Sequence, residues 1–82
     1  MQSIPHVTKQ IGANIRRLRF DSRPRLTQGQ LAKEIGTSAA VVSLWESGKR
    51  APSAVNIIRL ATFFAVPTDT ILAFKWEFKK KG

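Results

Sequence analysis

The residues of this sequence best suited to chemistry are basic side chains on both sides of the stretch from 26 to 48. Arg23 and Arg25 precede that stretch, and Lys49 and Arg50 follow it. Guanidinium and ammonium groups bind phosphate oxygens through charge-assisted hydrogen bonds. Fourteen Lys and Arg against five Asp and Glu give a net charge of +9. Polyanions, above all nucleic acid, are therefore the expected partners.

The sequence lacks the residues that catalysis or metal binding would need. The sequence contains no nucleophile–base pair, no carboxylate dyad and no Gly-rich phosphate loop after a strand. The acidic residues are scattered and suit surface or ion-pair positions: Asp21, Glu34, Glu46, Asp69 and Glu77. The absence of cysteine excludes disulfides and thiolate metal sites, and the single histidine, His6, is expected to be solvated. We therefore predict no catalysis, no metal and no other cofactor.

Two short helices are predicted at about 27 to 35 and 38 to 47. At the start of the first, Thr27 and Gln30 match a T-x-x-Q capping box, in which each side chain satisfies a backbone N–H. Gly36 follows at the position that favours a positive φ, so this helix should end there.

The second of these helices has one clearly apolar face. Thr37 and Ser38 offer hydroxyl caps at its start. Val42 and Trp45, three residues apart, should face the preceding helix, where the small Ala32 permits a close crossing. This layout is a helix-turn-helix, whose second helix enters the major groove of DNA.

The flanking segments predict three more helices. Residues 1–6 suit a flexible arm, and a helix should follow with apolar residues at helical spacing: Val7, Ile11, Ile15 and Leu18. The segment DSRPR at 21–25 should break it. Ser53 should cap a helix that buries Ile57, Leu60, Ala61 and Phe64, and Val66 and Pro67 should end it. Thr68 should cap a last short helix with Ile71 and Leu72. The prediction is one all-α domain over residues 7–73.

Residues 74–82 have a different pattern. Phe74, Trp76 and Phe78 alternate with charged residues, a period that suits an extended strand. A lone strand leaves its backbone groups unsatisfied, so the tail should either pair with its twin in a dimer or fold back over the core. We favour dimerisation.

Four segments resemble the lambda-repressor-like family of phage repressor and Cro type: IGANIRRLR at 11–19, LTQGQLAKEIG at 26–36, VVSLWESGKRAPS at 41–53 and NIIRLATFFAVPTDTIL at 56–72. The resemblance implies a five-helix domain that binds double-stranded DNA, commonly as a homodimer on a pseudo-palindromic operator. It also implies an ion pair between Arg19 and Glu46. The phosphate contacts that it implies are Arg19, Gln28, Thr37, Lys49 and Arg50.

The positions expected to face the groove depart from the family pattern: Ser38, Ala39, Ala40, Ser43 and Leu44. Only the two serines can hydrogen-bond to base edges. Specificity could instead come from DNA shape or from Arg23 or Arg25. A third alternative is that this apolar face binds a protein.

The leading hypothesis is a sequence-specific transcription regulator of the phage repressor/Cro or restriction–modification controller type. The alternative is an interaction module or antitoxin with the same fold. A chain of this length leaves no room for a separate sensor, so we expect no small-molecule ligand. No apolar run reaches the roughly 20 residues needed to span a bilayer. We expect no membrane partner and a cytoplasmic location, at the nucleoid when DNA is bound.

Overall fold

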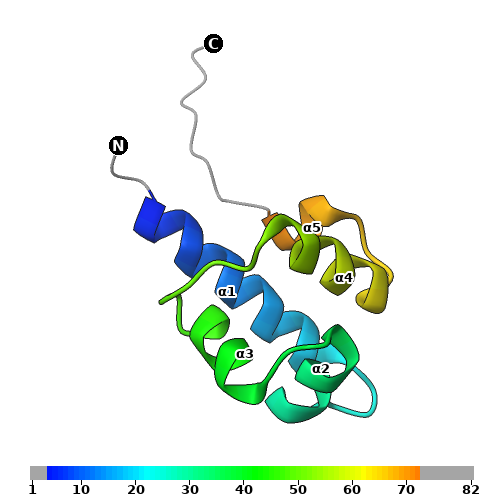
Figure 1. Cartoon of the computed structure of the whole chain (residues 1–82). Coiled ribbons are helices and arrows are strands. Elements are labelled where there is room, and N and C mark those ends of the chain that lie inside the picture. Colours follow the sequence, from blue (N-terminus) through cyan, green and yellow to red (C-terminus); the bar gives the residue numbers. More distant parts are fainter. Residues whose placement is uncertain (1–3, 73–82) are drawn as a thin grey trace.

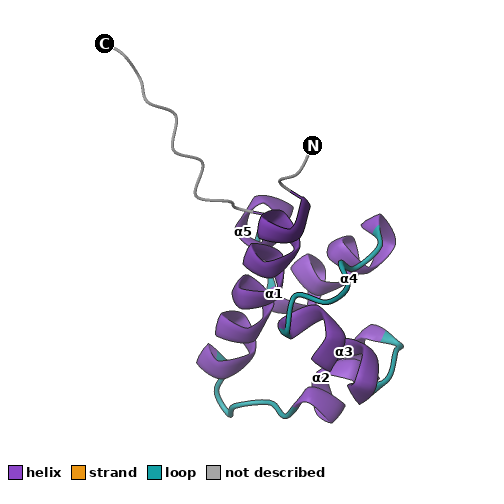
Figure 2. Cartoon of the chain, turned by 90° about the vertical axis from the view of Figure 1, so that its left-hand side faces the viewer, coloured by secondary structure: helices purple, strands orange, loops and turns teal. Residues whose placement is uncertain are grey.

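A computed structural model describes residues 4–72, and this part of the chain is helical throughout apart from short connections (Figures 1 and 2). The five helices of the described residues are α1 (Ile4–Asp21), α2 (Gln28–Ile35), α3 (Ala39–Glu46), α4 (Ala54–Phe64) and α5 (Thr68–Leu72). The predicted all-α class with five helices is therefore confirmed for the described residues. The aromatic tail residues Phe74, Trp76 and Phe78 lie outside the described residues.

The first helix begins earlier than its hydrophobic pattern indicates. α1 starts at Ile4, so residues 4–6 belong to this helix rather than to a flexible arm. Pro5 is compatible with this start, because N–H groups in the first turn have no intrahelical partner to lose. At its other end, α1 stops at Asp21, where the sequence predicts the break.

Local hydrogen bonds set the ends of the two helices of the helix-turn-helix. The Gln30 amide donates to Thr27 Oγ1 at 3.1 Å, and the Thr27 amide donates to Gln30 Oε1 at 2.8 Å. This reciprocal pair is the predicted capping box. Gly36 ends α2 with a φ of 88°, a value that costs glycine little. The Val41 amide donates to Ser38 Oγ at 3.2 Å, so Ser38 is the N-cap of α3.

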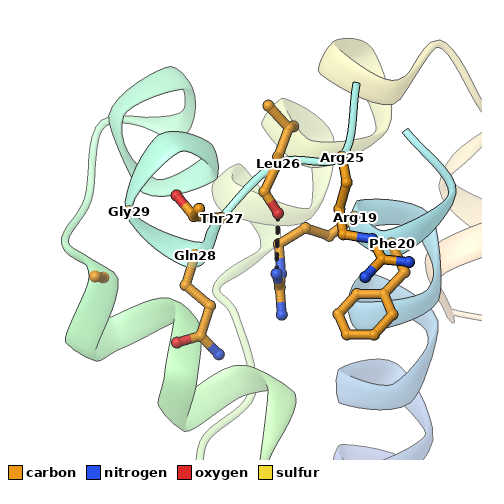
Figure 3. Close-up of a pocket in the computed structure, with 8 residues that line it drawn as sticks. Arg19, Phe20, Arg25, Leu26, Thr27, Gln28 and Gly29 are labelled. Atoms are coloured by element: carbon orange, nitrogen blue, oxygen red, sulfur yellow. Dashed lines mark hydrogen bonds between the residues drawn. The ribbon is translucent and has the colours of Figure 1, made fainter. Parts of the chain in front are cut away.

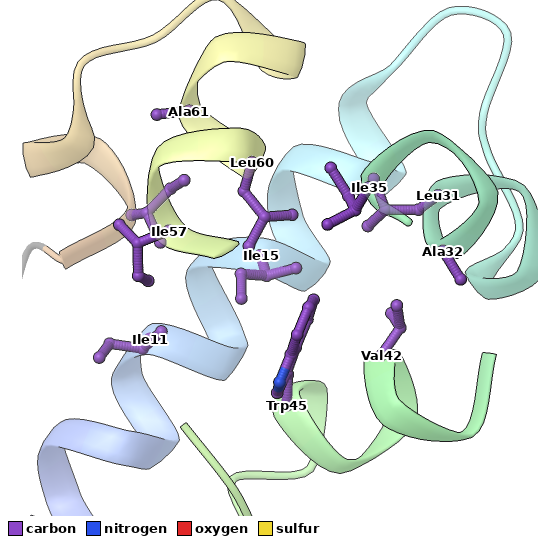
Figure 4. Packing of buried hydrophobic residues seen from close by; sticks show 11 residues of the cluster. Ile11, Ile15, Leu31, Ala32, Ile35, Val42, Trp45, Ile57, Leu60 and Ala61 are labelled. Atoms are coloured by element: carbon purple, nitrogen blue, oxygen red, sulfur yellow. The ribbon is translucent and has the colours of Figure 1, made fainter. Parts of the chain in front are cut away.

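One apolar core joins all five helices (Figure 4). Trp45 is 1% exposed and lies among isoleucine and leucine side chains from α1, α2 and α4, as its spacing from Val42 predicts. The buried apolar residues are Ile11, Ile15, Leu31, Ala32, Ile35, Val42, Trp45, Ile57, Leu60, Ala61 and Ile71. Val7, Leu18 and Phe64 pack against this core while remaining partly exposed.

Two residues of α1 make contacts that the hydrophobic pattern does not predict. A Cβ at Gly12 would collide with the backbone carbonyl of Trp45, so glycine lets α1 approach the end of α3. Asn14 is buried, and its Nδ2 donates to the Ile71 carbonyl at 2.8 Å. These contacts fix α1 against α3 on one side and against α5 on another.

Candidate nucleic-acid interface

The outer face of α3 carries few hydrogen-bonding groups. Ala39, Ala40 and Ser43 are exposed, and Leu44 is half-buried. Ser38 is exposed too, but its hydroxyl oxygen already accepts the bond that caps α3. Within the described part of the chain, the Ser43 hydroxyl has no hydrogen-bond partner. Ser43 is therefore the residue of this face best able to bond a base edge.

A bidentate ion pair links the end of α1 to the end of α3. Arg19 Nε lies 2.7 Å from Glu46 Oε2, and Arg19 Nη2 lies 2.7 Å from Glu46 Oε1. The two side chains are only 10% and 4% exposed. The hydrogen bond to Glu46 and the attraction of its carboxylate raise the pKa of Arg19 above its usual value, although burial opposes this shift. The guanidinium is therefore cationic throughout the physiological range.

The Arg19 guanidinium also hydrogen-bonds to the connection between α1 and α2. Its Nη1 also donates to the Leu26 carbonyl at 3.0 Å, so all three guanidinium nitrogens are bonded within the protein. These bonds hold the α1–α2 connection in place, and they leave one N–H on each of Nη1 and Nη2 available. A contact of Arg19 with the DNA backbone stays a prediction.

The Gln28 side chain, at the start of α2, hydrogen-bonds to this ion pair. Its Nε2 donates to Glu46 Oε1 at 3.0 Å. Because a carboxylate only accepts, this bond fixes which end of the amide faces Glu46, and it leaves the second N–H of Nε2 available. The backbone amides of Gln28 and Gly29 start α2 without a hydrogen-bond partner among the described residues. A helix start of this kind favours an anion.

The basic loop after α3 is held against the C-terminal end of that helix. The amides of Lys49 and Arg50 donate to the Leu44 carbonyl at 3.0 and 3.3 Å. Both side chains are exposed. Thr37, the remaining expected phosphate contact, is half-buried in the turn before α3, and its amide donates to the Ala32 carbonyl at 2.9 Å.

A cluster of arginines around Phe20 was not predicted from the sequence. The Cζ atoms of Arg25, Arg19 and Arg16 lie 4.5, 4.9 and 5.1 Å from the centroid of the Phe20 ring. Phe20 and Arg25 line a hollow of about 570 Å³, opposite the start of α2 (Figure 3). The hollow also borders Ala39 at the start of α3. Only the spacing of Arg16, Arg19 and Phe20 on one helix face hinted at this cluster.

Two other kinds of site are absent from residues 4–72. No group of three or more His, Cys, Asp or Glu side chains in this part of the chain could hold a metal ion. None of its helices is both long and apolar enough to cross a membrane.

Comparisons with known proteins agree with this geometry. A family model described as helix-turn-helix, HTH_3, matches residues 25–71. The chain is 40% identical over 48 residues to the HTH-type transcriptional activator BcrR of Enterococcus faecalis. That match covers 58% of this chain and 24% of BcrR, so the chain spans about a quarter of the length of this curated relative.

Two solved structures share the fold over most of the chain. The restriction-modification controller protein C.AhdI from Aeromonas hydrophila superposes with a TM-score of 0.73 at 30% identity, over 87% of this chain and 99% of C.AhdI. The P22 c2 repressor, solved in complex with a synthetic operator, gives a TM-score of 0.71 at 27% identity, over 80% and 97% of the two chains. The family and these relatives indicate a DNA-binding domain of the kind found in transcription regulators. The chain belongs to the Cro/C1-type helix-turn-helix family, HTH_3.

Proposed function

We propose that this protein is a sequence-specific transcription regulator that binds a pseudo-palindromic operator as a homodimer, with α3 in the major groove. The observation that carries the proposal is the arrangement around the exposed face of α3. The start of α2, whose first amides lack a partner among the described residues, adjoins α3 at Ala39 and Glu46. The loop after α3 exposes Lys49 and Arg50. Such an arrangement suits two segments of DNA backbone on either side of one groove.

The composition of α3 indicates which contacts would supply affinity and which would supply sequence preference. Phosphate contacts would supply most of the affinity, from Arg19, Gln28, Thr37, Lys49 and Arg50. Ser43 would bond one base edge, while Ala39 and Ala40 would contact thymine methyl groups. With so few base contacts, the remaining sequence preference would come from DNA shape.

A homodimer needs a surface that fits a second copy of itself. The described part of the chain has an apolar hollow of about 470 Å³ formed by α1, α4, α5 and the segment before α4. Ile58 and Leu72, which line this hollow, are 58% and 43% exposed. Covering this surface with a second copy would remove apolar area from water. This surface, with the tail residues Phe74, Trp76 and Phe78, is where we place the contact between two copies.

Selection from a random DNA library tests the proposal. The purified protein is mixed with random duplexes at near-physiological salt, and the retained DNA is sequenced. Enrichment of an inverted repeat with half-sites about ten base pairs apart is the expected result. Retention of DNA without a common motif would reject sequence-specific binding and leave attraction by charge alone.

Mass measurement in solution tests the dimer surface. Ile58→Glu places a charge in the hollow and should shift the protein from dimer to monomer at micromolar concentration. Val55→Glu is the matched control, because Val55 is 56% exposed on the same helix and does not line the hollow. Dissociation by the control variant alone would place the contact on another face of α4.

A protein-interaction module is the second candidate, and the exposed Ala39 and Ala40 beside the half-buried Val41 and Leu44 favour it. In that case the apolar outer face of α3 would bind a protein, as in an antitoxin. The isolated protein should then bind the selected operator no better than random DNA.

A further inference from the structure

Two arginines lie over the Phe20 ring and have no other polar partner in the part of the chain that the structure describes. Arg25 comes from the α1–α2 connection, and Arg16 lies one helical turn before Phe20 on α1. Both guanidinium groups lie within about 5 Å of the ring centroid, the range in which a cation is attracted to an aromatic ring. Neither makes a hydrogen bond or an ion pair within residues 4–72.

Neighbouring arginines differ in this respect. Arg19 is paired with Glu46, and Arg17 Nη2 donates to Asn14 Oδ1 at 3.0 Å. Arg23 Nη1 donates to the carbonyls of Phe20 and Ser22 at 3.2 and 3.1 Å. The positive charges of Arg16 and Arg25 are therefore concentrated around one ring, and neither is paired with a carboxylate within residues 4–72. A bound anion would lower the repulsion between them.

The two arginines line two hollows that share Arg19 and Gln28. Arg25 lines the hollow of about 570 Å³ that also borders Ala39 at the start of α3 (Figure 3). Arg16 lines a smaller hollow of about 260 Å³ together with Ser43 and Ser47. Because Gln28 borders both hollows, Arg25 and Arg16 lie beside the expected phosphate contact at the start of α2.

We propose that Arg25 and Arg16 bind two further DNA phosphates beside the Gln28 contact, and that Phe20 is the positioning residue that orders both side chains. Stacking uses the flat face of a guanidinium and leaves its N–H edge free for phosphate oxygens. Ordering before binding reduces the rotamer freedom that is lost when DNA arrives. This inference rests on the proposed DNA binding.

The salt dependence of binding to a mixed-sequence duplex measures how many phosphates the protein contacts. Arg25→Ala and Arg16→Ala should each weaken binding to every sequence and reduce the slope of log affinity against log salt by about one unit. Arg59→Ala is the matched control, since it removes the same charge from an exposed site on α4, away from Phe20. Slopes that change no more than in the control would overturn the proposal.

Variants of Phe20 test the positioning role. Phe20→Tyr keeps the ring and should keep the parent slope, whereas Phe20→Leu keeps an apolar side chain without the ring and should lower the affinity. In the DNA-free protein, the ring should shift the δ-methylene proton resonances of Arg25 and Arg16 upfield, and Phe20→Leu should abolish the shift. Parent-like methylene resonances and affinity in Phe20→Leu would reject the role of the ring.

The two proposals fail in different ways. If the parent protein does not bind duplex DNA in a salt-dependent manner, the proposed function fails. If the parent binds and selects a repeat while the Arg25 and Arg16 variants match Arg59→Ala, only this inference fails. Should Phe20→Leu not fold, the exposed arginine variants still decide the outcome, with melting curves as the check on their folding.

Discussion

The inner and outer faces of α3 are constrained in different ways. The inner face buries Val42 and Trp45 at 0% and 1% exposure, and the backbone at Trp45 lies so close to α1 that only Gly12 fits there. The outer face leaves Ala39, Ala40 and Ser43 exposed. Packing therefore constrains the inner face, while DNA alone would constrain the outer one. The low polarity of the outer face shifts the expected source of affinity to the basic residues around α3.

The largest expected effect is on the inner face. Trp45→Ala should lower the free energy of unfolding by roughly 3–5 kcal/mol, because it leaves a cavity at the centre of the core. That loss is most of the stability of a domain of this size. Thermal melting followed by circular dichroism measures it. Ala40→Ser, on the outer face of the same helix, should change stability by no more than about 0.5 kcal/mol. Equal melting of both variants would contradict the distinction between the faces.

The ion pair at the end of α3 should give the next largest effect. Arg19→Ala leaves the Glu46 carboxylate buried without its cation, at a cost of about 3 kcal/mol. Because the pKa of Arg19 is raised in the folded state, its contribution should be present at all pH values below the usual arginine pKa and lost only above it. Urea unfolding across pH 6 to 9 checks this, with Lys33→Ala, exposed on α2, as control. A variant that unfolds like the parent would mean that the pair stabilises nothing.

The basic loop should affect DNA affinity without changing stability. Replacing Lys49 or Arg50 with Ala should weaken binding about tenfold per lost phosphate contact near 0.1 M salt, equally for all sequences. Titrations at several salt concentrations measure both the affinity and the slope. An unchanged slope would remove these residues from the interface.

A substitution on the outer face of α3 should change the sequence specificity of DNA binding rather than the overall affinity. Ser43→Ala removes one hydroxyl, so discrimination at one base pair should fall by about 1 kcal/mol. Repeating the library selection with this variant shows whether one position of the motif loses information. If every position is retained, the groove face of α3 is read through DNA shape alone.

The smallest expected effect is a change in stability that leaves DNA binding unchanged. Ala65 ends α4 with a φ of 58°, which is strained for a residue with a Cβ. Ala65→Gly should therefore raise the free energy of unfolding by about 0.5–1 kcal/mol and leave DNA binding unchanged. Ala13→Gly, at an exposed position inside α1, should lower it by a similar amount. A destabilised Ala65→Gly variant would contradict the strain argument.

The sequence by itself determined the elements whose cause is local. The capping box of Thr27 and Gln30, the turn at Gly36 and the inward spacing of Val42 and Trp45 all depend on residues close together in the chain. Such signals are governed by hydrogen bonds and periodicity within one or two turns. They were enough to predict the helix-turn-helix and the class of partner.

Tertiary structure alone decided the contacts between residues far apart in the chain. Gly12 has no helical reason to be glycine until the backbone at Trp45 approaches it, and the buried Asn14 donates to the Ile71 carbonyl 57 residues later in the chain. Arg19 is fixed by its bonds to Glu46 and the Leu26 carbonyl, and Arg25 gained a position because the α1–α2 connection brings it over Phe20. The physical reason is the same in each case. A side chain's role is set by the groups that desolvate or neutralise it, and these are known only once the helices have packed.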